Sequence, residues 1–357
     1  MISKTTKIDG LNRVKYCRDM LKTNPILKNL FLELTMRCNE HCLHCGSYCG
    51  DRKSSELSFD QYKKILTEVT EDFNIKDIML CITGGEPLLR RDFFDIMTYA
   101  KNLGFRWGMT SNGTLITPEV AQKLYEAGMS TISISIDGLE QTHDEFRQTP
   151  GGYKKAMQGI QNLIDIGKFK HIQATTVVTH KNIDELDQLF AIFNDIDIDS
   201  WRVIGIEPIG RALSYPDLLL TKEDHKRLFE FIRDKRKAGE PVVYGCSHYL
   251  GLDYEGEVRE WYYFCGAGTT IASITANGDI ISCLDIERRP ELVQGNVLVD
   301  RFSDVWYNRF KNFRIDLSDK CSKCQSCTEK DRCHGDSFHS WNFEENRPNI
   351  CFKDILF

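Results

Sequence analysis

The chain has 357 residues, of which 41% are hydrophobic and 27% charged, with a net charge of −6. This length predicts two domains or one elaborated barrel, and the acidic balance argues against a nucleic-acid or membrane-surface partner, because phosphate binding usually needs a basic face. The sequence lacks the apolar run of a secretion signal or a membrane span, so we expect a cytoplasmic protein.

Residues 29–210 follow an N-terminal extension of residues 1–28 and alternate short apolar runs with helical patterns. Six apolar, β-branched runs are typical of strands in a parallel sheet covered on both faces: 29–36, 76–83, 105–111, 131–136, 171–179 and 201–208. Between them, Ser58 and Gln61 predict a capping box, and Thr117 before Pro118 predicts a helix start, with Gly128 at that helix's end. The pattern predicts an α/β fold, a partial (βα)6 TIM-like barrel with its site at the carboxyl ends of the strands.

The pattern changes after residue 210. Residues 211–262 are charged and predict a helical connector. Residues 263–357 predict a cysteine-rich domain of β-hairpin and loop, with Asn277 and Gly278 in the hairpin turn. Such a segment builds little core of its own, so bound metal is the expected source of its order.

Cysteine is the unusual residue type, with 14 in the chain. A cytosolic chain keeps its thiols reduced, so we do not expect disulfides. Single cysteines such as Cys17 and Cys81 are predicted to be small buried apolar residues. Cysteines grouped at short spacing would be an oxidation hazard without a metal, and they indicate metal sites.

The first group of cysteines follows the first predicted strand and therefore lies at the barrel mouth: Cys38, Cys42 and Cys45. A structural zinc site closes with four ligands, whereas three cysteines on a four-iron cluster leave one iron open to a small molecule. The alternative is zinc with His41 or His44 as the fourth ligand. Cys49 is interpreted as a bystander or a neighbour of the ligands.

This C-x3-C-x2-C loop is followed, at the end of the second strand, by the sequence Gly84, Gly85, Glu86 and Pro87. Together the two motifs resemble the radical SAM superfamily over roughly residues 29–210. The resemblance implies a 4Fe-4S cluster on the three cysteines and S-adenosylmethionine (SAM) as cofactors. It also implies reductive cleavage of SAM to a 5′-deoxyadenosyl radical, which abstracts hydrogen from a substrate.

The same resemblance implies which residues contact SAM. Glu86 and the glycine carbonyls before it accept hydrogen bonds from the SAM ammonium group. Arg147 pairs with the SAM carboxylate, with a solvated surface charge as the alternative. Ile206 lies at the adenine edge, although a buried core position explains it equally well. The ribose or methionine contacts are Ser111, Asn112, Ser135 and Asp137.

The second group of cysteines resembles a SPASM domain, a module that binds auxiliary iron–sulfur clusters. It comprises Cys265, Cys283, Cys321, Cys324, Cys327, Cys333 and Cys351, with Gly278 five residues before Cys283. One position departs from the family pattern, because Ser337 stands where a cysteine is expected and Cys321 is extra.

We therefore assign Cys321 to the cluster nearer the barrel, with Cys265 and Cys283. The outer cluster then takes Cys324, Cys327, Cys333 and Cys351. The shifted assignment exchanges Cys321 and Cys333. Seven thiols leave one iron of the two clusters without a protein thiolate; this iron is open to substrate or closed by a residue such as Cys246. Two zinc sites are the alternative for the whole group.

The two-part cysteine pattern favours an enzyme that modifies a ribosomally made peptide or protein by oxidation, crosslinking or epimerisation. Asp285 lies two residues beyond Cys283 and is the candidate catalytic base, with a turn residue as the alternative. Epimerisation would need a hydrogen donor such as Cys49 or Cys246. The expected partners are the peptide substrate and a flavodoxin- or ferredoxin-type electron donor. A leader sequence on the peptide would be held by the barrel rim or by a separate peptide-recognition protein. The rival functions are tetrapyrrole or other cofactor biosynthesis and a non-catalytic metal-binding or electron-transfer scaffold.

Overall fold

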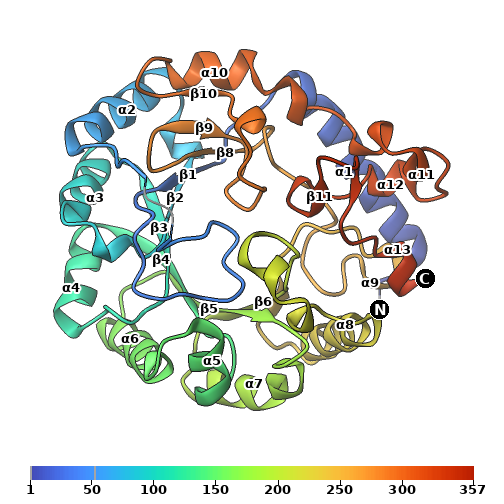
Figure 1. Cartoon of the computed structure of the whole chain (residues 1–357), viewed down its shortest axis with the longest axis horizontal. Coiled ribbons are helices and arrows are strands. Elements are labelled where there is room, and N and C mark those ends of the chain that lie inside the picture. Colours follow the sequence, from blue (N-terminus) through green and yellow to red (C-terminus); the bar gives the residue numbers. More distant parts are fainter. Residues whose placement is uncertain (1, 52–53) are drawn as a thin grey trace.

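The computed structural model describes residues 2–51 and 54–357, and ten of their strands form one curved sheet (Figure 1). The strand order is β10-β9-β8-β1-β2-β3-β4-β5-β6-β7. All six predicted strands are present and pair in parallel in chain order: β1 (Asn29–Glu33), β2 (Met79–Thr83), β3 (Arg106–Ser111), β4 (Met129–Ser135), β5 (His171–Val178) and β6 (Ser200–Gly205). The predicted partial barrel is confirmed.

Helices cover the outside of this sheet (Figure 1): α2 (Phe59–Asp72), α3 (Phe93–Asn102), α4 (Pro118–Glu126), α5 (Glu140–Arg147), α6 (Gly152–Ile166) and α7 (Leu186–Asp195). The predicted capping box of Ser58 and Gln61 begins α2. Thr117 caps α4, and Gly128 adopts a φ of +84° just beyond that helix's end, where glycine is favoured. Local sequence signals therefore predict where these helices begin and end.

The region predicted as a helical connector also contains a strand. Besides α8 (Lys222–Lys237) and α9 (Gly251–Tyr254), it forms β7 (Val242–Tyr244), which pairs in parallel with β6. The expectation of helix and loop alone was wrong here, because a three-residue strand carries almost no periodic signal. The parallel sheet thus extends one strand beyond the six predicted repeats.

The predicted C-terminal hairpin is present as β8 (Ile271–Ile274) and β9 (Asp279–Ile281), with Gly278 at a φ of +91° in the turn. Strand β8 also pairs in parallel with β1, so the hairpin continues the barrel sheet. The remaining elements are short: β10 (Gly295–Asn296), α10 (Phe302–Asn308), α11 (Ser322–Gln325), α12 (Lys330–Cys333), β11 (Trp341–Asn342), β12 (Arg347–Pro348) and α13 (Lys353–Leu356).

The N-terminal extension forms helix α1 (Lys4–Thr23), which packs against α9 and α12 (Figure 1). Two of its basic side chains are buried in ion pairs: Lys7 with Glu257 at 2.9 Å and Arg18 with Asp316 at 2.8 Å. Helix α1 therefore fastens the chain's beginning to its C-terminal part. Among the residues described, no helix is both long and apolar enough to cross a bilayer.

Candidate active site

The first three cysteines lie on the segment of residues 34–50 after β1, which we call the cysteine loop. Burial raises the pKa of Cys38 to about 11 and also raises that of Cys42, and in both cases charge on the neighbouring thiols adds to the effect. The pKa of Cys45 is lowered to about 5 by a hydrogen bond with the Cys49 thiol. These thiols are thus close enough to influence one another, and three soft ligands at the barrel mouth fit an iron–sulfur cluster.

The Gly84-Gly85 pair lets the end of β2 lie directly against the cysteine loop. A Cβ atom on Gly84 would come within 2.4 Å of the Thr35 carbonyl oxygen, and one on Gly85 within 2.1 Å of the Arg37 carbonyl oxygen. The backbone N–H groups of Gly85 and Glu86 donate to these same two carbonyls. Sequence reasoning predicted close approach to a ligand, and the structure shows close approach to the loop that bears the cysteines.

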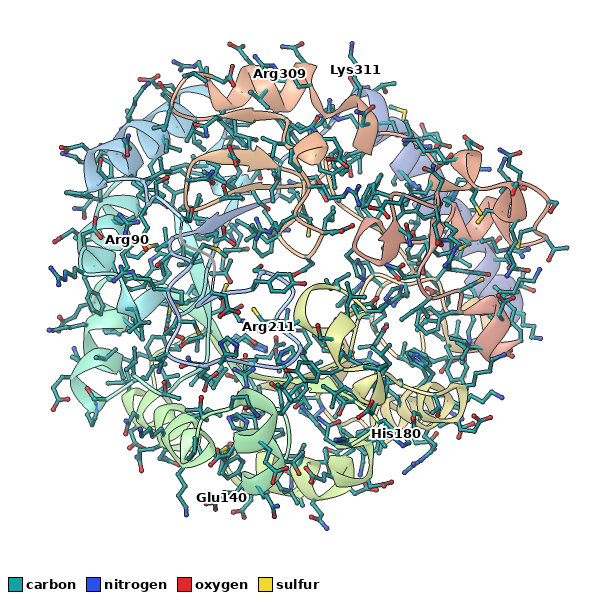
Figure 2. All side chains as sticks on the ribbon, in the orientation of Figure 1. Arg90, Glu140, His180, Arg211, Arg309 and Lys311 are labelled. Carbon is teal, nitrogen blue, oxygen red and sulfur yellow. The ribbon has the colours of Figure 1, made fainter. Side chains whose placement is uncertain are left out.

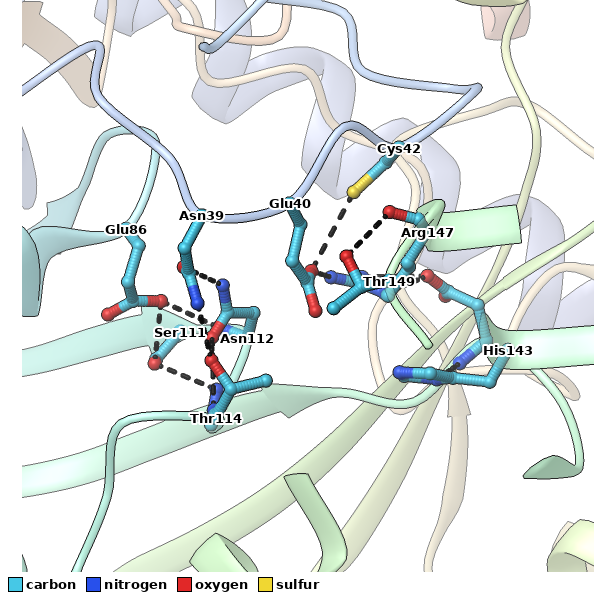
Figure 3. A network of polar contacts seen from close by, with 12 residues as sticks. Asn39, Glu40, Cys42, Glu86, Ser111, Asn112, Thr114, His143, Arg147 and Thr149 are labelled. Carbon is cyan, nitrogen blue, oxygen red and sulfur yellow. Dashed lines mark hydrogen bonds and ion pairs between the residues drawn. The ribbon is translucent and has the colours of Figure 1, made fainter. Parts of the chain in front are cut away.

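Glu86 is fully buried and holds the ends of β2 and β3 together (Figure 3). Its Oε2 accepts hydrogen bonds from the Ser111 hydroxyl and the Asn112 N–H, both at 2.9 Å, and its Oε1 accepts from the Leu88 N–H. Burial raises the pKa of Glu86 to about 7. A contact from Glu86 to the SAM ammonium group stays a prediction.

Arg147, at the end of α5, joins two buried carboxylates (Figure 3). Its Nη1 donates to Glu40 of the cysteine loop, and its Nε and Nη2 face Asp137 after β4, all at 2.7 Å. The Arg147 side chain is only 7% exposed, so the alternative of a solvated surface charge does not fit. Because each nitrogen already has a carboxylate partner, binding the SAM carboxylate would require an exchange of partners, and that role stays a prediction.

The other predicted SAM contacts lie at the same strand ends. Asp137 is fully buried, and although burial opposes it, Arg147 holds the pKa of this carboxyl below its usual value. The Asn112 side chain donates to Asn39 of the cysteine loop at 2.8 Å. Ser135 ends β4 opposite Thr175, and Ile206 is buried in an apolar cluster after β6. These positions agree with a ligand at the barrel mouth without defining its contacts.

Arg211 is a residue of the site that sequence reasoning missed, and Figure 2 places it near the centre of the barrel mouth. Its guanidinium donates to the carbonyls of Cys42 at 2.8 Å and Cys49 at 3.1 Å, and to the Asp51 carboxylate at 2.6 Å. The backbone N–H of Arg211 donates to the Cys45 carbonyl. Arg211 therefore holds the cysteine loop from the side of β6.

The two histidines of the cysteine loop, His41 and His44, make contacts other than those of a zinc ligand. The ring of His44 stacks on Phe146, with centroids 4.4 Å apart, and desolvation lowers its pKa to about 4. The side chain of His41 is half exposed beside Asp51. Both contacts favour structural roles for these rings.

A cavity of about 420 Å³ extends from the cysteine loop to the C-terminal hairpin. His44, Gly46 and Ser47 line it on one side, and Cys265 and Cys283 on the other. The cavity thus joins the two cysteine regions that the sequence separates by more than 200 residues.

Asp285 also lines this cavity, and its carboxylate lies 3.8 Å from the Cys283 thiol. Facing the same space are Cys246 and the guanidinium of Arg202, whose Nε donates to Thr175 on β5. Burial lowers the pKa of Arg202, and the charge of Asp285 acts in the opposite direction. The cavity therefore contains a carboxylate, a guanidinium and a thiol.

The remaining cysteines gather on the outer side of the C-terminal domain. Cys321 is buried, and its sulfur accepts a hydrogen bond from the Cys324 N–H at 3.2 Å. These two line one cavity with Cys327 and Cys351, and Cys333 lines the adjoining one with Cys324, Cys327 and Cys351. Cys321 and Cys333 therefore line two adjoining cavities that share Cys324, Cys327 and Cys351. Which cysteines bind each cluster stays a prediction.

Comparison with known proteins gives two family matches. The model of the radical SAM superfamily matches residues 32–192, and the SPASM model, an iron–sulfur cluster-binding domain, matches residues 265–328. The mycofactocin maturase MftC of Mycobacterium tuberculosis is 33% identical over 310 residues, covering 85% of this chain and 76% of that protein. The AdoMet-dependent heme synthase of Methanosarcina barkeri is 28% identical over 322 residues, covering 85% of this chain and 89% of that protein.

Among solved structures, Streptococcus suis SuiB bound to its precursor peptide SuiA has a TM-score of 0.69 at 21% identity, covering 91% of this chain and 75% of that one.

The chain belongs to the radical SAM superfamily. It is a radical SAM enzyme with a C-terminal SPASM-type domain, and its cofactors are 4Fe-4S clusters and SAM, as predicted. The number of clusters and their individual ligands stay predictions.

Proposed function

We propose that this enzyme modifies a ribosomally made peptide or protein by a radical reaction, through oxidation, crosslinking or epimerisation. The observation that carries the proposal is the cavity between the two cysteine regions, because it offers a substrate site next to both. Support comes from the relative named as a maturase and from a similar fold that binds a precursor peptide. When bound, SAM and the cluster on the cysteine loop supply a 5′-deoxyadenosyl radical that abstracts hydrogen.

The residues of the cavity have separate roles in this proposal. Arg202 binds a carbonyl or carboxylate of the substrate, because its guanidinium faces the cavity from β6. Asp285 accepts the proton that the substrate radical loses when it is oxidised, and a 4Fe-4S cluster bound by the C-terminal cysteines would accept the electron. The apolar side chains of Phe31, Val177 and Ile206 line the same cavity and exclude water.

The test uses the full-length enzyme, reconstituted anaerobically, with SAM, a reductant and, as peptide probe, the product of any short open reading frame found beside its gene. We expect 5′-deoxyadenosine together with a change in peptide mass, and Cys42→Ala should abolish both. Asp285→Asn should still form 5′-deoxyadenosine but yield little oxidised peptide. A peptide of unchanged mass, with 5′-deoxyadenosine formation indifferent to its presence, would overturn the proposal. A flavodoxin or ferredoxin supplying the electron, and a separate protein holding the peptide, belong to the same proposal.

Tetrapyrrole modification is the second candidate, because the heme synthase relative matches over 89% of its own length. The same assay with iron-coproporphyrin III, the porphyrin in the name of another relative, Fe-coproporphyrin III synthase of Methanosarcina barkeri, distinguishes the two functions. Loss of mass from the porphyrin, coupled to 5′-deoxyadenosine, would favour the tetrapyrrole function.

A further inference from the structure

Four side chains from three separate segments converge beside the cavity, outside the cysteine groups described so far. The ligand atoms of Glu207, Cys246, His248 and His339 all lie within 4.8 Å of one another, and no other such group of three or more occurs in residues 2–51 and 54–357. The Nε2 atom of His248 is 2.6 Å from a Glu207 carboxylate oxygen and 3.2 Å from the Nε2 of His339. Three of the four, all except the buried His248, also line the cavity.

The surroundings of His248 fix the direction of its Nε2 atom. Its Nδ1 lies 2.9 Å from the Asp336 carboxylate, whose other oxygen accepts the Tyr249 N–H at 3.0 Å. His248 and Asp336 are both buried. A carboxylate that accepts the Nδ1 proton leaves the Nε2 lone pair for a cation, and this is the usual arrangement behind a metal-bound histidine.

We propose that Glu207, Cys246, His248 and His339 bind one divalent transition-metal ion of the zinc or ferrous-iron kind. Imidazole, thiolate and carboxylate are the ligands that these ions take in proteins. A tetrahedral centre with bonds of about 2.1 Å separates its ligand atoms by about 3.4 Å. The separations in this group run from 2.6 Å to at most 4.8 Å and bracket that value.

The short distances between the ligand atoms also distinguish this site from the ligand set of an iron–sulfur cluster. In a four-iron cluster each protein ligand binds a different iron and points outwards, so the ligand atoms lie farther apart than in a mononuclear site. Cys265 and Cys283 line the same cavity but are not members of the group.

The ion would join three parts of the chain. Glu207 follows β6, Cys246 and His248 follow β7, and His339 belongs to the C-terminal domain. Ser337, which stands where the SPASM pattern has a cysteine, donates to the Ser247 carbonyl and brings two of these segments together. Four protein ligands close a site, so its expected role is to fasten the C-terminal domain to the barrel. Metal binding would also remove Cys246 as a hydrogen donor.

The test measures metal binding by the reconstituted full-length enzyme, with Co²⁺ and Zn²⁺ as probes. We expect about one Co²⁺ per chain by elemental analysis, with a high-spin Co²⁺ signal in electron paramagnetic resonance while the clusters are oxidised and silent. Glu207→Gln and His339→Gln should each abolish this binding, and Asp336→Asn should weaken it by about 10- to 100-fold. The control is His180→Gln, a half-exposed imidazole paired with Asp224 and labelled in Figure 2, which should bind Co²⁺ like the wild type.

Two results would overturn the proposal. One is Co²⁺ binding that is absent from the wild type or unchanged in both Glu207→Gln and His339→Gln. Glu207→Gln preserves the shape of the side chain, so a folding defect would not explain a loss of Co²⁺ binding in this variant. The other is a loss of about four irons and four sulfides from Cys246→Ser, which would make Cys246 a cluster ligand. Neither readout depends on the substrate, so this inference can fail while the proposed function holds, and the reverse is also true.

Discussion

Replacing Arg147 by methionine should destabilise the protein even when no SAM is bound. The substitution removes the only guanidinium that pairs with Glu40 and Asp137 in the described contacts, and both carboxylates are 0% exposed. Breaking a buried ion pair by removing one partner costs about 3–5 kcal/mol, because the remaining charge stays buried without compensation. We therefore expect the free energy of unfolding of the SAM-free protein to fall by about that amount.

The assay is urea unfolding followed by circular dichroism, with Arg227→Met as the matched control. The Arg227 side chain is 52% exposed and pairs with the exposed Asp184, so its loss should cost less than about 1 kcal/mol. Adding Glu40→Gln and Asp137→Asn to Arg147→Met should recover most of the lost stability, because no buried charge then remains unpaired. If Arg147→Met cost no more than the control and only weakened SAM binding, Arg147 would be a SAM contact and the network argument would fail.

Three further predictions concern the cysteine loop and its supports. Gly85→Ala should displace the loop, since its Cβ would lie 2.1 Å from the Arg37 carbonyl, and iron analysis should show cluster loss. The control is Gly152→Ala, whose Cβ would come no nearer than 3.3 Å to the Thr149 methyl group, and this variant should keep its iron. Folding raises the pKa of Glu86 from 4.5 to about 7. The free energy of unfolding of the wild type, relative to that of Glu86→Gln, should therefore fall by on the order of 3 kcal/mol as the pH rises from about 4.5 to 7. If the two proteins showed the same dependence of unfolding free energy on pH across this range, the prediction would be refuted. Arg211→Leu removes the donor to two loop carbonyls and should slow 5′-deoxyadenosine formation by about tenfold or more, and an unchanged rate would count against the anchoring role.

The barrel and the position of its cysteine loop could be predicted from sequence, because their signals are local. Each parallel strand is a short apolar run, and capping residues such as Ser58 with Gln61 mark where a helix begins. Cys38, Cys42 and Cys45 come directly after β1, so their place at the barrel mouth follows from the strand alone. In each case the residues that carry the signal are neighbours in the chain.

The features that were missed depend on contacts between distant residues. Strand β7 has three residues and exists through its pairing with β6. Arg211 has no motif of its own, since its role comes from carbonyls more than 150 residues away in the chain.

Strand β1 explains why the two cysteine regions share one cavity. Its carboxyl end leads into the cysteine loop, while its two edges pair in parallel with β2 and with β8 of the hairpin. Phe31, in the middle of β1, pairs in register with Ser273 and lines the cavity between the loop and Cys283. A shift of the β1–β8 register by one residue would turn the hairpin's inward side chains to the opposite face of the sheet. The distance between the cysteine loop and Cys283 is therefore set by the backbone pairing of β1 with β8, and the substrate proposed for the cavity would lie between the two cysteine regions.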